Sequence, residues 1–232
     1  MNTLQSPKLT RKGAQTRECL LDTAIRLFVE KGYASTTMRD VAAATGTSLG
    51  LTYHYFASKE DIVLALYTRL AVELEQDVQA LAPAPIAERF EWAIRHKLQR
   101  LAPYRAVLGA LLSTALMPQS GIAVLGKRTI DIQQQTRQVF LSLVAGANDA
   151  PPEPLARDLA TMLYAGHLLI LLFWLHDPTP YTRATHELIT LTCTMLARGR
   201  RLLRLPPIAK TFAQFAHTIG AVFAPDEMTQ VT

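Results

Sequence analysis

The sequence predicts an all-α protein with a small N-terminal helix-turn-helix part and a larger helical body. Almost every segment repeats its apolar residues with a helical period, and no segment alternates with the period of two that is typical of strands. Prolines divide the C-terminal part into pieces of helix length, and Thr, Ser and Gly stand at the expected helix ends. Because 49% of the 232 residues are hydrophobic, the chain can fill a core, and wholesale disorder is excluded.

The first predicted helix is identified by its apolar face. Leu21, Ala24, Ile25 and Phe28 lie at positions i, i+3, i+4 and i+7, the spacing of one helix face. Gly32 follows, at the place where a left-handed residue often ends a helix.

Two short helices are predicted next. Thr37 and Asp40 form a capping-box pattern that begins the first of them, and this helix stops near Gly46. Thr47 or Ser48 begins the second, which reaches about residue 56. Two short helices joined by a tight turn have the dimensions of a helix-turn-helix motif.

A long fourth helix and six body helices complete the predicted fold. Ser58 and Asp61 begin the long helix, which runs to about Leu81, and a Pro-rich break follows it. The body helices are expected at 86–102, 104–116, 122–146, 153–176, 181–204 and 208–223. The expected divisions are 1–16 as a flexible basic arm, 17–66 as the helix-turn-helix domain, 67–205 as the body, and 206–232 as a C-terminal amphipathic helix and tail.

The second helix of the motif has a composition that suits a nucleic-acid backbone. Residues 48–56 contain no acid, so no side chain there repels phosphate. Tyr53 and Tyr55 can offer hydroxyls to phosphate oxygens, and Phe56 is expected to anchor the helix to the core. Lys59, at the start of the next helix, is interpreted as a phosphate contact; the alternative is an ordinary exposed lysine.

These residues resemble a known family. Residues 17–66 look like the DNA-binding domain of the TetR/AcrR family of bacterial transcriptional regulators. The resemblance includes the end of the first helix and the capping and turn positions, namely Ala24, Leu27, Phe28, Gly32, Tyr33, Thr36, Thr37, Asp40, Val41, Ala42, Gly46, Tyr53, Phe56 and Lys59. It implies an operator-binding regulator, with repression as the usual mode.

The resemblance also implies which residues lie nearest to DNA. They are Thr37, Thr47, Ser48, Leu49, Gly50, Leu51, Tyr53, Tyr55 and Lys59. Leu49 and Leu51 cannot form hydrogen bonds with bases, so specificity would depend on thymine methyls, Ser48 and DNA shape. Thr52 departs from the family, which often has a large aliphatic residue there, and its hydroxyl needs a partner if it is buried.

By the same resemblance the protein is expected to be a homodimer that binds a small-molecule effector in its body. The helices near 153–176 and 181–204 are the predicted dimer interface, because the first is apolar on nearly all sides. Candidate ligand-lining residues at helical spacing are Phe90, Ile94, Leu98, Leu108, Leu112, Met117, Phe140, His167 and Trp174. Plain core packing remains the alternative for each of them.

Charge, cysteine content and hydropathy limit the other possibilities. The net charge of +5 is concentrated near the N-terminus, where Lys8, Arg11 and Lys12 suit either a minor-groove arm or a solvated tail. Cys19 and Cys193 are expected to be reduced core residues of a cytoplasmic protein. The uncharged run 159–175 is shorter than the roughly 20 residues of a membrane span, so no membrane partner is expected.

The sequence was also searched for features of an enzyme and of a protein–protein interaction scaffold, the two other classes of function. The common catalytic motifs are missing from the sequence, and its six histidines show no i, i+3 or i, i+4 pairing, so neither an enzyme, a cofactor nor a metal site is predicted. The alternative function is a helical scaffold that acts through protein–protein interaction without sequence-specific DNA binding.

Overall fold

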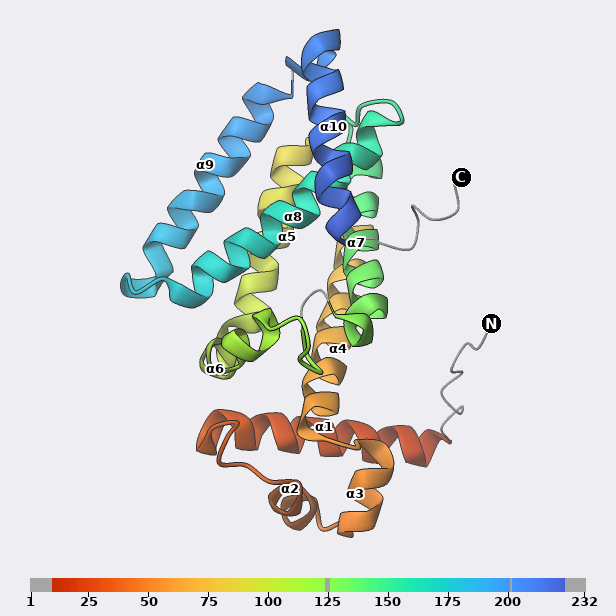
Figure 1. Ribbon diagram of the computed structural model, residues 1–232, viewed down its shortest axis with the longest axis vertical. Helices are drawn as coiled ribbons and strands as arrows, with labels where there is room; N and C mark the ends of the chain where they lie inside the picture. Colours follow the sequence, from red (N-terminus) through yellow and green to blue (C-terminus); the bar gives the residue numbers. More distant parts are fainter. Residues whose placement is uncertain (1–9, 124–125, 201, 224–232) are drawn as a thin grey trace. The chain divides into compact units, whose positions relative to one another are not determined.

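The computed structural model describes residues 10–123, 126–200 and 202–223, and within these ranges all regular structure is helical (Figure 1). The predicted all-α class is therefore confirmed. The chain divides into two compact units, one ending at Leu66 and the other beginning at Tyr67. The boundary falls inside one continuous helix, α4 (Lys59–Gln79).

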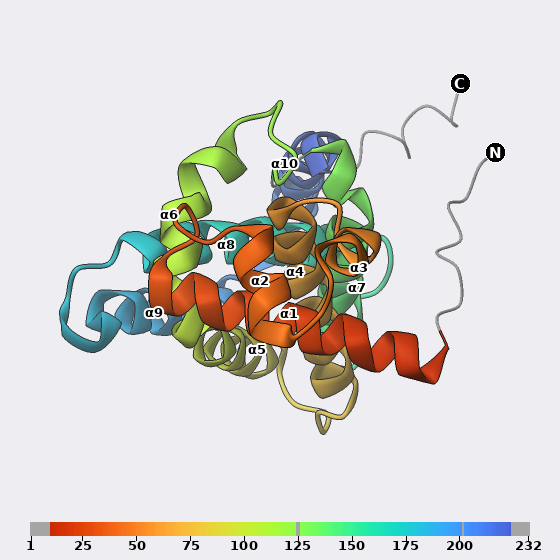
Figure 2. The same ribbon diagram turned by 90° about the horizontal axis from the view of Figure 1, so that it is seen from below.

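The first unit contains α1 (Arg11–Lys31), α2 (Met38–Thr45), α3 (Leu49–Tyr55) and the start of α4. Helix α2 packs against α1, and α3 packs against α2 (Figure 2). The predicted face of α1 forms the core of this unit, since Leu21, Ala24, Ile25 and Phe28 are all buried. This packing fixes the position of α3 within the unit.

Two expectations about the N-terminal segment differ from the structure. Arg11 and Lys12 lie in the first turn of α1, which begins after the Thr10 cap, so the helix includes part of the predicted arm; Lys8 is outside the described residues. Cys19 is exposed instead of buried, because it lies beside the apolar face that Leu20 and Leu21 form. Cys193 is buried, as expected.

The second unit contains the rest of α4 and six further α-helices in the described ranges. They are α5 (Ile86–Leu101), α6 (Arg105–Leu116), α7 (Ile130–Ala145), α8 (Leu155–His176), α9 (Arg183–Gly199) and α10 (Pro206–Phe223). Short 3-10 helices occupy Ala102–Tyr104, Lys127–Thr129, Pro180–Thr182 and Leu202–Arg204. Their bounds agree with the predicted helices to within a few residues, except for α7 and the end of α9.

Helix α7 is shorter than the predicted helix 122–146. Extended backbone at Gly126 precedes a 3-10 turn, and the α-helix begins only at Ile130. The Thr129 hydroxyl donates to the carbonyls of Ala123 and Gly126, so the turn before the helix is closed by a side chain. The apolar spacing of this segment resembles that of a helix because Ile122 and Ala123 are buried in the same core.

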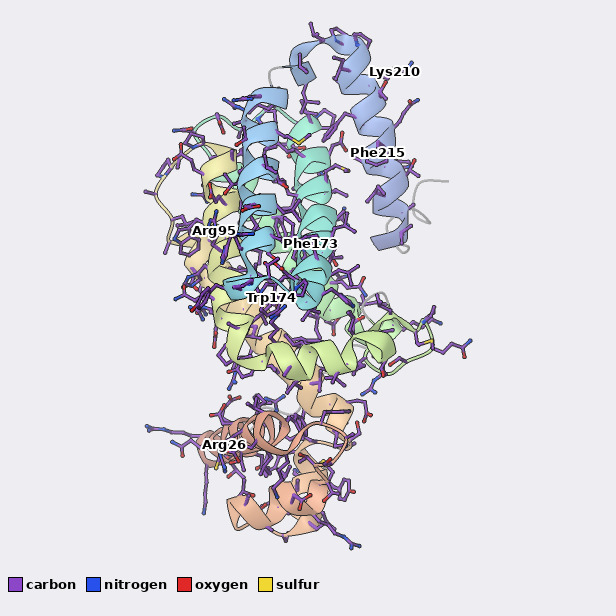
Figure 3. The ribbon with its side chains drawn as sticks, turned by 90° about the vertical axis from the view of Figure 1, so that its left-hand side faces the viewer. Arg26, Arg95, Phe173, Trp174, Lys210 and Phe215 are labelled. Atoms are coloured by element: carbon purple, nitrogen blue, oxygen red, sulfur yellow. The ribbon has the colours of Figure 1, made fainter. Side chains whose placement is uncertain are left out.

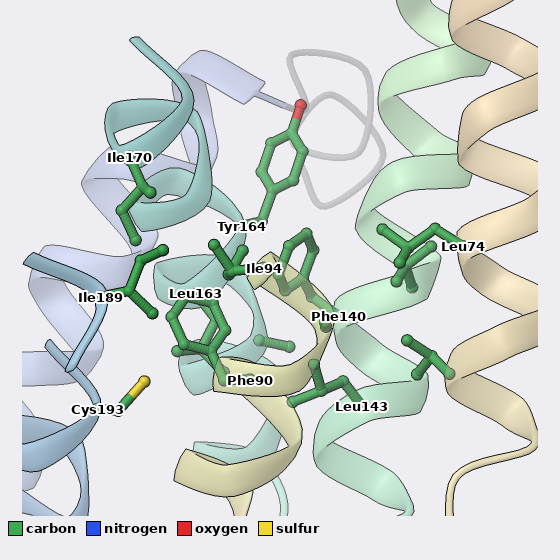
Figure 4. Packing of buried hydrophobic residues seen from close by; sticks show 14 of the residues in the cluster. Leu74, Phe90, Ile94, Phe140, Leu143, Leu163, Tyr164, Ile170, Ile189 and Cys193 are labelled. Carbon is green, nitrogen blue, oxygen red and sulfur yellow. The ribbon is translucent and has the colours of Figure 1, made fainter. Parts of the chain in front are cut away.

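The core of the second unit lies among α5, α7, α8 and α9. Phe140 of α7 lies close to Phe90 of α5 and Tyr164 of α8, with ring centroids 6.2 and 6.1 Å apart, respectively (Figure 4). Leu163 and Ile189 join the same cluster. These contacts join helices that are far apart in the sequence and fix their positions within the second unit.

The C-terminal helix α10 packs on α8 of the same chain. Ala216 of α10 is buried, whereas Phe215 beside it is 54% exposed (Figure 3). Helix α10 therefore has one face on the body and a second, partly apolar face in solvent.

A buried arginine joins the ends of two helices in the second unit. Arg89 of α5 is buried, and its guanidinium donates to four backbone carbonyls, those of Val78, Leu81, Ala82 and Leu143. The last carbonyls of a helix have no partner within the helix, so Arg89 satisfies groups that burial would otherwise penalise.

Gly146 leaves the space that this arginine needs. A Cβ added at Gly146 would lie 2.6 Å from Nη2 of Arg89 and 3.3 Å from the Ser142 carbonyl oxygen. Because the guanidinium is already held by four carbonyls, it has little freedom to move away.

Candidate functional site

Caps fix the start of α2 and the turn between α2 and α3. The Thr37 hydroxyl accepts from the Asp40 amide, and the Asp40 carboxylate accepts from the Thr37 amide at 2.7 Å, which confirms the predicted capping box. The hydrogen bonds from Thr37 lower the pKa of the Asp40 carboxyl. Gly46 ends α2 in the left-handed region at φ 66°, where a side chain would be strained. Ser48 then caps α3 by accepting from the Leu51 amide.

A chain of hydroxyl groups fixes α3 to this turn. Thr45 donates to backbone carbonyls of α2 and lies 2.9 Å from the Thr47 hydroxyl, which lies 3.1 Å from the Thr52 hydroxyl. Thr52 is fully buried and also donates to the Ser48 carbonyl. The buried Thr52 hydroxyl thus has hydrogen-bond partners, as expected from the sequence. These hydrogen bonds hold the start of α3 in place.

Helix α3 has one face in the core and one in solvent. Thr52 and Phe56 are buried, whereas Gly50 is open and Leu51 and Tyr53 are 39% and 48% exposed. The helix has no acidic side chain. It therefore presents an uncharged, partly aromatic surface on a firmly held backbone.

The nine predicted DNA-contact residues lie at the start of α2, in the turn after it, on α3 or at the start of α4. Exposed ones are Thr37, Ser48, Gly50, Leu51 and Tyr53, and partly buried ones are Thr47, Leu49, Tyr55 and Lys59. The structure brings all of them together in the first unit; a contact with DNA remains a prediction for each.

Lys59 has a partner within the protein. Its ammonium donates to the Tyr33 carbonyl at 2.7 Å and lies 4.4 Å from the centre of the Tyr33 ring. Glu60 and Asp61 follow it in the first turn of α4, where they already complement the helix dipole. Lys59 therefore anchors the end of the motif to the α1–α2 connection, a role that the sequence interpretation did not include.

The second unit contains an apolar cavity of about 160 Å³ that is partly open to solvent. It lies among the part of α4 from Tyr67 onward, α5, α6, α7 and α8, and the residues before α7. Its lining is mainly leucine, isoleucine and alanine, with a few polar side chains.

Three of the nine predicted ligand residues line this cavity: Leu108, Leu112 and His167. Five others are core residues, namely Phe90, Ile94, Leu98, Phe140 and Trp174, and Met117 is 63% exposed. The positions of those five residues therefore fit the alternative of plain core packing.

Sequence reasoning missed Lys97, which lines the cavity from α5. A signal was available, since Lys97 continues the apolar stripe formed by Phe90, Ile94 and Leu101 on that helix. A cation on the inward face of an amphipathic helix is uncommon and indicates a buried polar site.

Lys97 and His167 form a hydrogen-bonded pair in the cavity wall. The Lys97 ammonium lies 3.0 Å from Nε2 of His167, and Nδ1 of the same ring bonds to the Tyr164 carbonyl. Burial lowers the pKa of Lys97 to about 8. Burial, and next the charge of Lys97, lower the pKa of His167 well below its usual value.

Two surfaces of the second unit are apolar and exposed. Leu169 and Phe173 on α8, and Leu191 and Met195 on α9, are between 44% and 73% exposed, and α8 packs against α9 (Figure 3).

In the described ranges, α8 is also the one helix long and apolar enough to cross a membrane, but it packs against α7, α9 and α10 as a core helix does. The described residues contain no group of three metal-ligating side chains.

Comparison with known proteins identifies the first unit. Residues 20–66 match the family model described as bacterial regulatory proteins, tetR family. An HTH-type transcriptional repressor of Mycobacterium tuberculosis is 37% identical over 70 residues, which are 30% of this chain and 37% of that protein. The HTH-type transcriptional regulator AcrR of Shigella flexneri is 34% identical over 79 residues, 33% of this chain and 37% of that protein. The chain thus matches just over a third of the length of these relatives.

Solved structures share the fold over most of the chain. A TetR transcriptional regulator from Nitrosomonas europaea has a TM-score of 0.61 at 19% identity, covering 79% of this chain and 98% of that one. FadR, a repressor from Thermus thermophilus solved with lauroyl-CoA, has a TM-score of 0.57 at 20% identity, covering 79% and 94%.

Proposed function

Residues 20–66 of this protein belong to the TetR family of bacterial regulatory proteins, and from this premise we propose that the chain is a cytoplasmic transcriptional repressor. It binds a two-half-site operator as a homodimer and is released by a small-molecule effector. The effector shifts the balance between two states only if it prefers one of them.

The observation that carries the proposal is the outward face of α3. Gly50, Leu51 and Tyr53 are exposed on a helix whose other face is held by Thr52 and Phe56. The recognition helix of a helix-turn-helix enters the major groove with its N-terminal end, which is where Gly50 and Leu51 lie. Because Gly50 has no side chain, the helix backbone can approach base edges closely there.

The surrounding polar groups suit the DNA backbone. In this proposal Tyr53 donates its hydroxyl to a phosphate, and Tyr55 and Lys59 support it. Thr37 lies near a phosphate at the start of α2, with its hydroxyl donated to Asp40. Ser48 and the residues after it face base edges. Since Lys59 is already bonded to Tyr33, it contributes through charge and by holding the motif together more than as a free phosphate ligand.

Exposed apolar side chains on α8 and α9 support the proposed dimer. Leu169 and Phe173 are one helical turn apart on α8, and Leu191 and Met195 are one turn apart on α9. Apolar patches of this kind mark interfaces between proteins. A second copy of the same two helices would cover them and would supply the second reading helix.

The cavity of the second unit supports effector binding. It is a concave site lined by helices, its surface is mostly apolar, and it has a few polar groups, which is common in ligand sites. The T. thermophilus FadR repressor, which shares this fold, was solved in complex with lauroyl-CoA, so a small-molecule ligand has a precedent in a repressor of this fold.

The first experiment is binding of the purified full-length protein to the DNA that flanks its own gene, titrated with salt against random competitor. We expect a protected site with two related halves that are one or more helical turns apart, and an affinity that falls with salt. No preference over competitor at any salt would contradict the proposal and favour the interaction-scaffold alternative.

A glycine substitution tests whether α3 is the reading helix. Gly50→Ala should lower operator affinity about tenfold because its methyl group meets the DNA surface. Within the protein the new Cβ meets no atom within 4 Å, so the free energy of unfolding should rise by about 0.5–1 kcal/mol.

The matched control is Gly109→Ala, on α6, which is also exposed and also open around the added Cβ. It should give the same gain in thermal stability and leave operator affinity unchanged. Equal operator affinity for both variants would mean that α3 does not approach DNA at Gly50.

A further inference from the structure

Lys97 lines an apolar cavity without a carboxylate partner. Among the described residues that line the cavity, none is Asp or Glu. In the described part of the chain, the one hydrogen bond that Lys97 makes is to Nε2 of His167, which leaves two of its three N–H donors without a protein acceptor.

The direction of the hydrogen bonds fixes the state of His167. The Tyr164 carbonyl can only accept, so Nδ1 of His167 carries the proton. Nε2 of the neutral ring is then the acceptor for the Lys97 ammonium. Because His167 is buried and its pKa is lowered well below the usual value, it stays neutral at physiological pH and cannot balance the charge of Lys97.

Lys97 is partly buried in an apolar wall, where a cation without an anion is costly and a bound anion relieves that cost. Burial lowers the pKa of Lys97 only to about 8, so the side chain is mostly charged at pH 7. A carboxylate within hydrogen-bond distance would supply the missing acceptor and the compensating charge. Thr136, on α7, adds a hydroxyl to the lining and makes no side-chain hydrogen bond among the described residues.

We propose that this cavity binds a small carboxylic acid with an apolar body, whose carboxylate pairs with Lys97 while the body packs among the leucines of α5, α6 and α8. The inference rests on the proposed function in one respect, since it names the chemical class of the effector. The site itself is defined by the cavity, Lys97 and the fixed orientation of His167.

The cavity volume indicates which acids are suitable as probes. A protein cavity of roughly 150 Å³ accommodates benzene, and this one is about 160 Å³. Benzoate and hexanoate are therefore suitable probes. Their neutral isosteres, benzamide and hexanamide, have almost the same shape and lack the charge, so they separate charge pairing from apolar packing.

The test is calorimetric titration of the full-length protein with both acids and both amides. We expect the acids to bind about tenfold more tightly than the amides, as for a hydrogen bond to a charged group. Lys97→Met, which keeps the length of the side chain and removes its charge, should abolish this preference. Lys210→Met on α10, an exposed lysine, is the matched control and should retain it.

The pH dependence provides a second readout. The titratable side chains of the lining are Tyr67 on α4, Lys97 on α5, and Tyr164 and His167 on α8; the described lining residues of α6 and α7 are not titratable. Burial raises the pKa values of Tyr67 and Tyr164 to about 12, so both stay neutral near pH 8. Acid affinity should therefore fall as pH rises above about 8 and Lys97 loses its proton, while amide affinity should not change.

Equal affinity for acids and amides, no binding of either acid at millimolar concentration, or unchanged acid affinity in Lys97→Met would each overturn the inference. The melting temperature of unliganded Lys97→Met checks that the variant is folded; we expect a small change, since the substitution removes an unpaired charge but also leaves Nε2 of the buried His167 without its donor. Operator release by benzoate or hexanoate is measured separately. Binding of the acid without release would leave the site intact and refute the effector step of the proposed function.

Discussion

The buried polar groups of the two units find their partners in different ways. In the first unit they are the hydroxyls of Thr36 and Thr52, which bond to atoms at most nine residues away in the chain. In the second unit Arg89 reaches Leu143, 54 residues away, and His167 bonds to Lys97, 70 residues away. Thr129, Thr161 and Asp177 of the second unit also bond locally, so what distinguishes this unit is the added cations, which make hydrogen bonds that span more than 50 residues.

The largest expected effect is on stability, from loss of the arginine in the second unit. Arg89→Met should lower the free energy of unfolding by about 3 kcal/mol, because several buried carbonyls lose their donor at once. Chemical denaturation with tryptophan fluorescence measures this change.

Arg198→Met, at the exposed end of α9, is the control and should change stability by less than about 0.5 kcal/mol. Similar stabilities of the two variants would show that the carbonyls bonded to Arg89 can find water instead.

A smaller effect is expected in the first unit. Thr52→Val keeps the shape of a buried side chain but removes the hydroxyl that bonds to Thr47 and the Ser48 carbonyl. We expect a loss of about 1–2 kcal/mol in the free energy of unfolding, measured by thermal denaturation.

Thr218→Val is its counterpart in the second unit, since Thr218 also donates to the carbonyl four residues earlier but is exposed. It should be nearly neutral. If both substitutions cost the same, the hydroxyl chain contributes no more than an ordinary helical threonine.

The smallest effect on stability is expected at a cysteine. Cys19→Ser should change the free energy of unfolding by less than about 0.5 kcal/mol, since Cys19 is exposed. With a thiol reagent at pH 8, one thiol of the native protein should react quickly, and Cys19→Ser should remove that phase.

Cys193 should react only after unfolding. Burial raises the pKa of its thiol to about 11, so the reactive thiolate is scarce at pH 8 in the native state. Two fast thiols in the native protein would contradict the buried position of Cys193.

The first unit could be predicted in detail from the sequence because its signals are local. The capping box at Thr37, the turn at Gly46 and the cap at Ser48 each depend on residues within a few positions of each other. The role of Lys59 was not predicted in full, since its bond to Tyr33 joins residues 26 positions apart and leaves no periodic pattern.

The second unit could be predicted as a set of helices but not as a site. Apolar periodicity cannot separate a residue that packs against another helix, such as Phe140, from one that lines a cavity, such as Leu112. The start of α7 was misplaced for a similar reason, because Ile122 is buried although it lies outside the helix.

Because Arg89 lies next to Gly146, the residue at one of these positions determines which residues the other position tolerates. An alanine at 146 would take the space of the guanidinium. A shorter residue at 89 would leave that space unfilled and four carbonyls without a hydrogen-bond donor. Each substitution alone is therefore harmful, and the two together would fill the space but still leave the four carbonyls without their donor. A redesign of this body would therefore have to choose residues 89 and 146 together. Natural substitutions at the two positions are expected to depend on each other in the same way.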